Sequence, residues 1–359
     1  MRAARGRQGN ELPVWFMRQA GRSLPEYRAV RQSSGTVGAM LESCRRPELV
    51  AEITCQPVRR YEVDAAIFYS DIMVPLKAAG VGVDIVAGIG PVVADPIRTR
   101  ADLDRVPALE PEALGFVGEA VRLIADDLGD VPLIGFAGAP FTLASYLVEG
   151  GPSKDHARTK AMMAGDPQLW AELCGRLAQI SAVFLQVQIA AGASAVQLFD
   201  SWAGSLAPDD YAAAVLPHAA AVLGQVSSVP RIHFGVGTGE LLGLMTSAGA
   251  DVIGVDWRVP LAEASVRAAG SPAGTGAAGR VVQGNLDPAL LTAPWDVLAD
   301  RVRAVIRSGA RAPGHIFNLG HGVPPTADPG VLTRIVELVH REGPTLRADS
   351  DVVAARRRL

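Results

Sequence analysis

The segment PVWFMRQAGRSLPEYRAVR, residues 13–31, contains a complete strand-turn-helix pattern. Its apolar run Val14–Met17 predicts a strand that stops abruptly at an arginine. Ser23 and Glu26 have the spacing of a capping box, and Pro25 suits a first helical turn, so a helix is expected to follow. A strand that leads directly into a helix is the repeating unit of an α/β fold.

The same pattern recurs to the end of the chain. Eight short apolar runs predict strands, most of them followed by a helical stretch: Val14–Met17, Ala65–Tyr69, Leu133–Phe136, Ala195–Phe199, Ile232–Phe234, Val252–Val255, Val281–Gln283 and Ile316–Asn318. Eight such units favour a single (β/α)8 TIM barrel. A doubly wound sheet is the alternative, because the sequence determines neither strand order nor closure. Glycine-rich turns between short apolar runs predict an antiparallel hairpin insertion near residues 80–97.

The remaining periodic stretches predict helices and set the domain limits. Helical patterns run over residues 47–62, 113–128 and 167–191. A last helix should begin at Pro329 with Asp328 as its cap. We expect one catalytic domain over residues 12–345, with flexible termini at 1–11 and 346–359.

Composition indicates a globular cytoplasmic protein. Of the 359 residues, 49% are hydrophobic and 20% charged, which fits a well-buried core. A net charge of -3 gives no general reason to expect nucleic acid or a membrane surface as partner. Three scattered cysteines suit a reducing compartment. The basic N-terminus leads to no signal-like apolar core, and no uninterrupted apolar stretch reaches the length of a bilayer span.

Polar residues follow most of the predicted strands. In a barrel the active site lies where the strands end, so these side chains should meet at one mouth: Arg18, Arg22, Asp71, Asp200, Ser201, Asp256, Asn285 and His321. Four arginines between residues 18 and 31 form a dense positive patch, and arginine matches carboxylate or phosphate groups. The alternative is a solvated basic helix face.

Single residues allow more than one interpretation. Asp71 is either a helix cap or a fixed negative charge that accepts hydrogen bonds from a bound N–H group. His321 lies between two glycines, which favours function over loop filling. Tyr146 alone is as well explained by core packing on a helix. The turn GVGTGE at residues 235–240 weakly resembles an anion-binding turn, but the full dinucleotide spacing is missing.

Several reaction classes find no support in the sequence. The chain has three lysines, none at a strand end, which argues against Schiff-base catalysis. Its histidines and cysteines show no zinc spacing, and neither a GxSxG nor a Walker motif occurs. We therefore expect no metal and no organic cofactor.

Eight motifs together resemble the uroporphyrinogen decarboxylase family. They are, in chain order, MRQAGRSLPEYR, FYSDI, GAPFTLASYLVEGG, LFDSWAG, HFGVGTGELL, VDWRVPL, QGNLDP and FNLGHGVPPTADP, spread over about residues 12–340. The resemblance implies a single barrel domain, usually homodimeric, that acts without a cofactor. Its reaction removes carbon dioxide from the four acetate side chains of uroporphyrinogen III and gives coproporphyrinogen III, in haem and tetrapyrrole biosynthesis.

The resemblance also implies residue roles. Arg18 and Arg22 would bind substrate carboxylates and assist proton transfer, and Asp71 would hold the pyrrole N–H groups. Tyr146, Ser201 and His321 would contact the propionate and acetate arms, and Asp71, Arg18, Arg22, Tyr146 and His321 form the expected catalytic set. Further substrate-binding positions are Gln19, Ala20, Gly21, Arg31 and Phe199. Some members read LFDSHAG where this chain has Trp202, so a histidine role at that position is absent here.

Loss of carbon dioxide leaves an electron pair that needs a sink, and a pyrrole protonated on a ring carbon provides one. The protein then needs only to stabilise positive charge and deliver protons. Asp71 would do the first, while Arg22 acting through water and His321 are both candidate proton donors. Two alternatives within the same superfamily remain: a corrinoid-linked methyltransferase, whose His/Cys zinc site this chain lacks, and a non-catalytic tetrapyrrole-binding protein.

Overall fold

The computed structural model describes residues 1–9, 11–21, 23–37, 39–270 and 279–356, with residues 349–356 described by their backbone alone. Arg22, one of the expected catalytic residues, lies outside the described residues.

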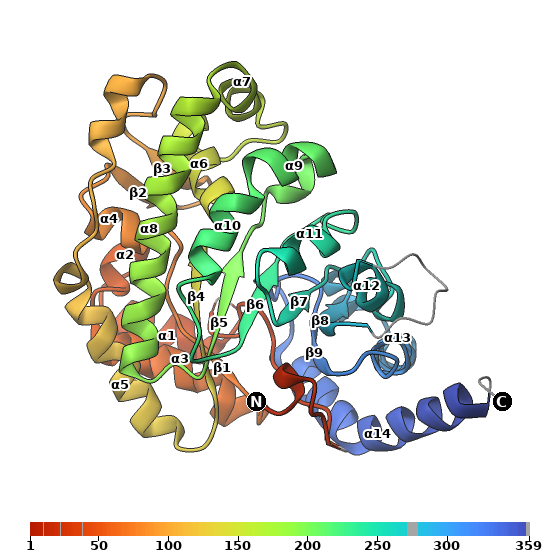
Figure 1. Ribbon diagram of the computed structural model, residues 1–359. Coiled ribbons are helices and arrows are strands. Elements are labelled where there is room, and N and C mark those ends of the chain that lie inside the picture. The colour runs from red at the N-terminus through yellow and green to blue at the C-terminus, as the bar shows by residue number, and fades with distance from the viewer. Residues whose placement is uncertain (10, 22, 38, 271–278, 357–359) are drawn as a thin grey trace.

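A curved parallel sheet of seven strands forms the centre of the molecule (Figure 1). Its strands are β1 (Ala66–Ile67), β4 (Leu133–Gly138), β5 (Ala195–Phe199), β6 (Arg231–Phe234), β7 (Val252–Gly254), β8 (Val281–Leu286) and β9 (His315–Leu319). Neighbours in the sheet are also neighbours in the chain, and every pairing is parallel. The doubly wound alternative is therefore wrong, because it requires the strand order to reverse. Nearly all strand residues are buried, as expected for a sheet covered by helices.

Helices follow the strands and surround the sheet (Figure 1). The α-helices are α1 (Pro25–Ser33), α2 (Met40–Ser43), α3 (Pro47–Tyr61), α4 (Val74–Ala78), α5 (Gly115–Leu128), α6 (Pro140–Glu149), α7 (Ala157–Gly165), α8 (Pro167–Ala191), α9 (Pro208–Ala214), α10 (Leu216–Leu223), α11 (Leu242–Ser247), α12 (Leu261–Ala268), α13 (Trp295–Gly309) and α14 (Pro329–Arg356). Short 3-10 helices are η1 (Ala3–Arg5), η2 (Arg100–Arg105), η3 (Pro111–Leu114), η4 (Ala203–Ser205) and η5 (Pro288–Thr292). The predictions for α3, α5 and α8 are confirmed, and α14 begins at Pro329 with an Asp328 carboxylate oxygen accepting the Gly330 N–H at 2.8 Å.

The first predicted strand, Val14–Met17, is not a strand. It forms one isolated bridge, in which the Trp15 N–H donates to the Phe317 carbonyl at 3.2 Å and the Phe317 N–H to the Pro13 carbonyl at 2.8 Å. The Met17 N–H then donates to the side chain of Asn318, so the backbone ladder cannot continue. On its other side the segment accepts the Asp64 N–H at the Val14 carbonyl, at 2.8 Å.

The predicted hairpin insertion is confirmed. Strands β2 (Val83–Val86) and β3 (Gly90–Val93) pair antiparallel in a separate two-stranded sheet. Its return strand is tied to the end of α6, because the Val93 N–H donates to the Gly150 carbonyl at 3.0 Å. The hairpin thus packs where the chain leaves α6.

The capping box expected at α1 is wrong. The helix begins at Pro25 and its N-cap is Leu24, which has no side-chain acceptor. Ser23 therefore precedes the cap position by one residue, and its buried hydroxyl has no hydrogen-bond partner among the described residues. The Glu26 carboxylate pairs instead with Arg60 of α3.

Helix α8 is an exception to the prediction that no apolar stretch reaches the length of a bilayer span. Its 25 residues include a window with a mean hydropathy of 1.3, which is sufficient by length and composition to cross a membrane. Inside the protein, 56% of that window is buried. Burial of this kind is what the central helix of a large domain shows.

The chain ends carry regular structure where the structure describes them. The buried Ala3 and Ala4 lie in η1, and α14 continues to Arg356, extending beyond the body of the molecule in Figure 1. The expected domain limits and the flexibility of the termini stay predictions.

Candidate active site

Arg18 and His321 are brought together where the segment after β9 packs closely against the N-terminal segment. The Val323 N–H donates to the Met17 carbonyl at 2.8 Å, which joins the segment after β9 to the N-terminal segment. A Cβ atom at Gly322 would lie 2.5 Å from Cδ of Arg18, and one at Gly320 would lie 2.5 Å from the backbone nitrogen of Trp257. The glycines around His321 are therefore required by close approach, and Gly322 packs against the stem of Arg18.

Arg18 is an exposed residue in an unusual backbone conformation. Its φ of 60° lies in the left-handed region, which a non-glycine residue adopts only at some cost. Arg18 is thus an exposed residue between the buried Met17 and the fully buried Gln19. The guanidinium lowers the pKa values of three groups, Asp71, Tyr146 and His321, and therefore lies within electrostatic reach of all of them.

Asp71 is a half-buried residue four positions after the end of β1. Its Oδ1 accepts the Met73 N–H at 2.9 Å, so the carboxylate also shapes the turn into α4. Burial raises the pKa of this carboxyl most strongly, and the Met73 N–H and Arg18 oppose that rise. The helix-cap interpretation is wrong, because the N-cap of α4 is Met73 and the Asp71 carboxylate supports the turn before it. The role of Asp71 as a fixed negative charge toward a ligand stays a prediction.

His321 and Tyr146 complete the group. Burial lowers the pKa of His321, Arg18 and Arg258 lower it further, and Asp256 opposes them. Burial raises the pKa of Tyr146, a half-buried residue of α6. At neutral pH the imidazole is therefore uncharged and the phenol protonated. Three of the five expected catalytic residues, Asp71, Tyr146 and His321, thus lie within electrostatic reach of a fourth, Arg18, and the fifth is Arg22.

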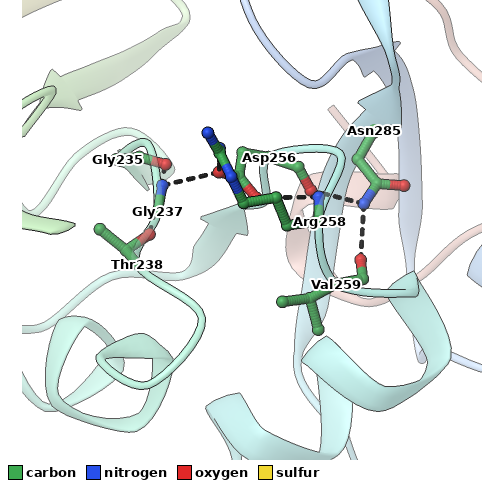
Figure 2. Close-up of polar contacts among 7 residues, drawn as sticks. All are labelled: Gly235, Gly237, Thr238, Asp256, Arg258, Val259 and Asn285. Carbon is green, nitrogen blue, oxygen red and sulfur yellow. Dashed lines mark hydrogen bonds and ion pairs between the residues drawn. The ribbon is translucent and has the colours of Figure 1, made fainter.

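Asp256 and Arg258, which both affect the pKa of His321, form a second ionic group that Figure 2 shows. The buried Asp256 follows β7, and its Oδ2 accepts the Gly237 N–H at 2.6 Å and pairs with the Arg258 guanidinium. The turn 235–240 therefore does bind an anion, but that anion is a carboxylate of the protein itself. Arg258 also stacks on the Trp257 ring, with 4.1 Å between its Cζ and the ring centroid.

Two residues expected at the mouth are engaged in the scaffold. Asn285 donates from Nδ2 to the carbonyls of Asp256 and Val259, each at 2.7 Å (Figure 2). Asp200 is fully buried, and its Oδ1 accepts the hydroxyl proton of Thr142 at 3.0 Å. Each side chain satisfies neighbouring polar groups that would otherwise be buried without a partner, and the prediction that it also faces the mouth stays a prediction.

Gln19 and Arg31 are likewise held inside. The Gln19 amide accepts the Phe16 N–H at 2.8 Å and donates to the Ala65 carbonyl at 2.9 Å. Arg31 is 7% exposed, and its guanidinium donates to the Tyr69 hydroxyl at 2.6 Å. A substrate contact through either side chain would have to break these bonds, and their expected binding roles stay predictions.

The other expected binding positions lie near the surface of the fold. Ser201 and Phe199 are half-buried around the end of β5, and the Phe199 ring meets that of Phe136 edge-on at 5.4 Å between centroids. Ala20 is half-buried and Gly21 is buried in the turn after Arg18. Their contacts with a substrate stay predictions.

Sequence reasoning missed two contributors. Arg258 lowers the pKa of His321 and pairs with Asp256. The only sign of this role in the sequence was the position of Arg258, two residues after an aspartate at a strand end. The Trp202 ring meets the Tyr146 ring edge-on, and although the place of Trp202 in LFDSWAG was visible in the sequence, its contact with α6 was not.

Two further features bear on ligands. In the described parts of the chain, no group of three or more histidine, cysteine, aspartate or glutamate side chains could hold a metal ion. An open pocket of about 590 Å³ lies outside the group of site residues, with Arg98, Arg158 and Leu169 among its lining.

Comparison with known proteins agrees with this geometry. The family model described as uroporphyrinogen decarboxylase (URO-D) matches residues 1–342. A uroporphyrinogen decarboxylase of Salinispora tropica is 61% identical over 342 residues, covering 95% of this chain and 89% of that protein. One from Streptomyces avermitilis is 62% identical over 344 residues, covering 95% and 94%.

Among solved structures, a methyltransferase from Methanosarcina mazei superposes with a TM-score of 0.76 at 18% identity, covering 94% of this chain and 96% of that one. A B12-independent methionine synthase from Shewanella sp. W3-18-1 gives a TM-score of 0.54 at 12% identity, covering 82% and 88%. At these identities the likeness extends to the fold alone, so it lends no weight to the methyltransferase alternative.

Proposed function

This chain belongs to the uroporphyrinogen decarboxylase family and is a carboxy-lyase, and from that premise we propose its reaction in detail. It removes the four acetate carboxyl groups of uroporphyrinogen III and releases coproporphyrinogen III, without a metal or organic cofactor. The observation that carries the proposal is the grouping of Arg18, Asp71, Tyr146 and His321, which come from four separate parts of the chain.

Arg18 is the proposed anchor for substrate carboxylates. Its guanidinium is exposed, carries a permanent charge and has the planar fork that carboxylates match. Gly322 fixes the stem of the side chain from behind, which limits the conformations that a bound carboxylate would have to select. Arg22 is proposed as a second anchor on the strength of the family motif.

Asp71 is the proposed partner of the macrocycle. When a pyrrole carbon is protonated, the ring becomes cationic and its N–H groups become stronger donors. A carboxylate in contact with that cation gains about 4 kcal/mol at a separation of about 4 Å and an effective dielectric near 20. Burial raises the pKa of Asp71, and in such a site the interaction with a positive charge is stronger than it would be in water when that charge develops.

His321 is the proposed proton carrier. Its imidazole is neutral at pH 7 in the free protein, because burial and two neighbouring guanidiniums disfavour its charged form. It can accept a proton only when those positive charges are offset, which a substrate carboxylate on Arg18 would do. Tyr146 is proposed to contact a carboxylate arm.

The direct test is the reaction itself. Purified protein is incubated anaerobically with enzymatically prepared uroporphyrinogen III, and the carboxyl groups of the product are counted by chromatography after oxidation to porphyrins. We expect stepwise conversion from eight carboxyl groups to four. A product that keeps all eight would refute the proposal.

We also propose that the seven strands and residues 13–17 form a closed eight-membered (β/α)8 barrel in one domain over residues 12–345. The support is that the N-terminal segment hydrogen-bonds to β9 on one side and to Asp64, just before β1, on the other.

A cytoplasmic homodimer is proposed from the family alone, and analytical ultracentrifugation would test the oligomeric state.

A further inference from the structure

A buried acid and a buried base face each other behind the turn that follows β5. Oδ2 of Asp200 lies 3.7 Å from Nε2 of His233, a residue of β6, and both side chains are fully buried. Neither atom has a hydrogen-bond partner in the described parts of the chain. Because a buried polar atom without a partner is costly, the two atoms are expected to be stabilised by each other.

The backbone determines which ring nitrogen of His233 carries a hydrogen. Nδ1 lies 3.4 Å from the Met245 carbonyl, and a carbonyl oxygen only accepts, so Nδ1 is the donor. In a neutral imidazole Nε2 would then present a lone pair to the lone pairs of the Asp200 carboxylate. A second ring proton replaces this repulsion with an ion pair. The proton belongs on the ring, because an imidazole is a stronger base than a carboxylate.

Two further titratable groups lie within electrostatic reach of Asp200, and neither can balance its charge. They are Cys174 of α8 and Tyr211 of α9. Burial raises the pKa of the Cys174 thiol and of the Tyr211 phenol, and Asp200 raises both further. Both groups therefore keep their protons at pH 7 and are neutral. The histidine at 3.7 Å is the neighbour that can carry a positive charge.

The other carboxylate oxygen of Asp200 fixes the turn after β5. Oδ1 accepts the hydroxyl proton of Thr142 at 3.0 Å, and Oγ1 of Thr142 accepts the Trp202 N–H at 3.3 Å. The Asp200 carbonyl closes the same turn by accepting the Ala203 N–H at 3.2 Å. Ser201 lies inside this turn, so its backbone is held on both sides.

We propose that a buried chain of three side chains positions Ser201 to meet a carboxylate arm of the substrate. In this chain His233 carries two ring protons and forms a buried ion pair with Asp200. Asp200 accepts the hydroxyl proton of Thr142, and this leaves Oγ1 of Thr142 to accept the Trp202 N–H. The inference rests on the proposed function, in which Ser201 contacts a substrate arm. The three residues act through the turn and are positioning residues.

Nitrogen-15 NMR of labelled histidine tests the charge on His233 independently of activity. The His233 signals are assigned as those lost in His233→Gln. We expect both ring nitrogens to be protonated at pH 7 in the wild type. In Asp200→Asn, whose amide oxygen can still accept from Thr142, the ring should become neutral with its hydrogen on Nδ1. A neutral His233 ring in the wild type would overturn the ion pair.

Thermal unfolding tests the same pair through stability. His233→Leu leaves a buried carboxylate without a counter-charge, so we expect a lower Tm than in the wild type. Adding Asp200→Asn removes that charge, and the double variant should unfold at a higher temperature than His233→Leu alone. If His233→Leu does not fold, the recovery of folded protein in the double variant is the equivalent result. A double variant no more stable than His233→Leu contradicts the ion pair.

A double-mutant cycle tests the positioning of Ser201. The variants are Thr142→Val, Ser201→Ala and the two combined, assayed for kcat and KM with uroporphyrinogen III. We expect Thr142→Val to raise KM about fivefold, the loss expected from one neutral hydrogen bond, with little change in kcat. In the Ser201→Ala background the same substitution should have almost no effect, because the hydroxyl it positions is gone.

Thr333→Val is the matched control for the loss of a threonine hydroxyl. The Thr333 hydroxyl donates to the Pro329 carbonyl at 3.3 Å within α14. This variant should leave both kcat and KM unchanged.

The outcomes separate this inference from the proposed function. A wild-type protein that does not decarboxylate uroporphyrinogen III refutes the function, while the NMR and unfolding measurements still decide the ion pair. An active wild type in which Thr142→Val raises KM by the same factor with and without the Ser201 hydroxyl overturns the positioning role.

Discussion

The substitution Asp71→Asn separates the electrostatic role of this residue from its structural one. Asparagine keeps the oxygen that accepts the Met73 N–H at 2.9 Å, so the turn into α4 is expected to survive. What disappears is the negative charge. The interaction of about 4 kcal/mol proposed between that charge and a protonated pyrrole corresponds to about a thousandfold in rate, at a factor of 10 for each 1.36 kcal/mol.

Stability should move the other way. Burial raises the pKa of Asp71 above its ordinary value of 3.8, so the folded protein binds this proton more tightly than the unfolded chain does. Ionising Asp71 therefore costs stability as pH rises above 3.8, and this cost is present at pH 7. We expect the free energy of unfolding of Asp71→Asn at pH 7 to equal or exceed that of the wild type. The advantage should shrink as pH falls toward 3.8.

The assay is single-turnover conversion of uroporphyrinogen III under anaerobic conditions, together with thermal unfolding from pH 4 to pH 8. Asp328→Asn is the matched control, because an oxygen of Asp328 accepts an N–H two residues ahead at 2.8 Å in the same type of turn. That variant should keep its turnover. A folded Asp71→Asn protein with turnover within tenfold of the wild type would refute the proposed role of the charge.

The other predictions concern charges around the site and at the barrel edge. Arg18→Ala should weaken substrate affinity about tenfold to hundredfold at low salt and less at high salt, as equilibrium binding at two ionic strengths would measure. Arg258→Gln removes a cation that lowers the pKa of His321, so the alkaline limb of the kcat/KM profile, along which a proton-donating His321 loses its proton, should move to higher pH. His340 donates from Nε2 to the Asp64 carboxylate at 2.8 Å, which raises the pKa of His340. The stability from this ion pair is complete below pH 6.5 and is lost as pH rises through the raised value, so His340→Gln should cost about 0.5 kcal/mol at pH 5.5 and almost nothing at pH 9, in chemical denaturation.

The fold was largely predictable because its strands are buried on both faces. Runs such as Leu133–Phe136 and Ala195–Phe199 contain almost no polar residue, and only a covered parallel sheet accommodates such runs. The N-terminal run Val14–Met17 is equally apolar but fails as a strand. Its last N–H is taken by the Asn318 side chain 301 positions away, a competition that no local pattern reveals.

A site residue could be predicted where its neighbours in the chain lack the bulky side chains of a packed core. His321 stood out because two glycines flank it, and in the structure Gly320 lies close to the backbone of Trp257 and Gly322 close to the side chain of Arg18. Asp200 and Asn285 looked similar in the sequence, yet their polar atoms satisfy Thr142 and two backbone carbonyls. A side chain at a strand end binds the scaffold where distant segments place unpaired hydrogen-bonding groups beside it. The local sequence does not reveal those groups.

The effect of Arg18 on its neighbours links substrate binding to proton transfer. In the free protein this guanidinium lowers the pKa values of Asp71, Tyr146 and His321 together. A carboxylate bound to Arg18 offsets the positive charge, and all three groups then hold protons more tightly. The change affects protonation at neutral pH most strongly for His321, because its ordinary pKa of 6.5 lies closest to neutrality.

Substrate binding would thus convert an imidazole that is neutral in the free enzyme into one that carries a proton beside the ring it must protonate. The alkaline limb governed by His321 should accordingly lie at higher pH in kcat, which reports the complex, than in kcat/KM, which reports the free enzyme. Coincident limbs in the two profiles would show that Arg18 and His321 are not coupled through the substrate.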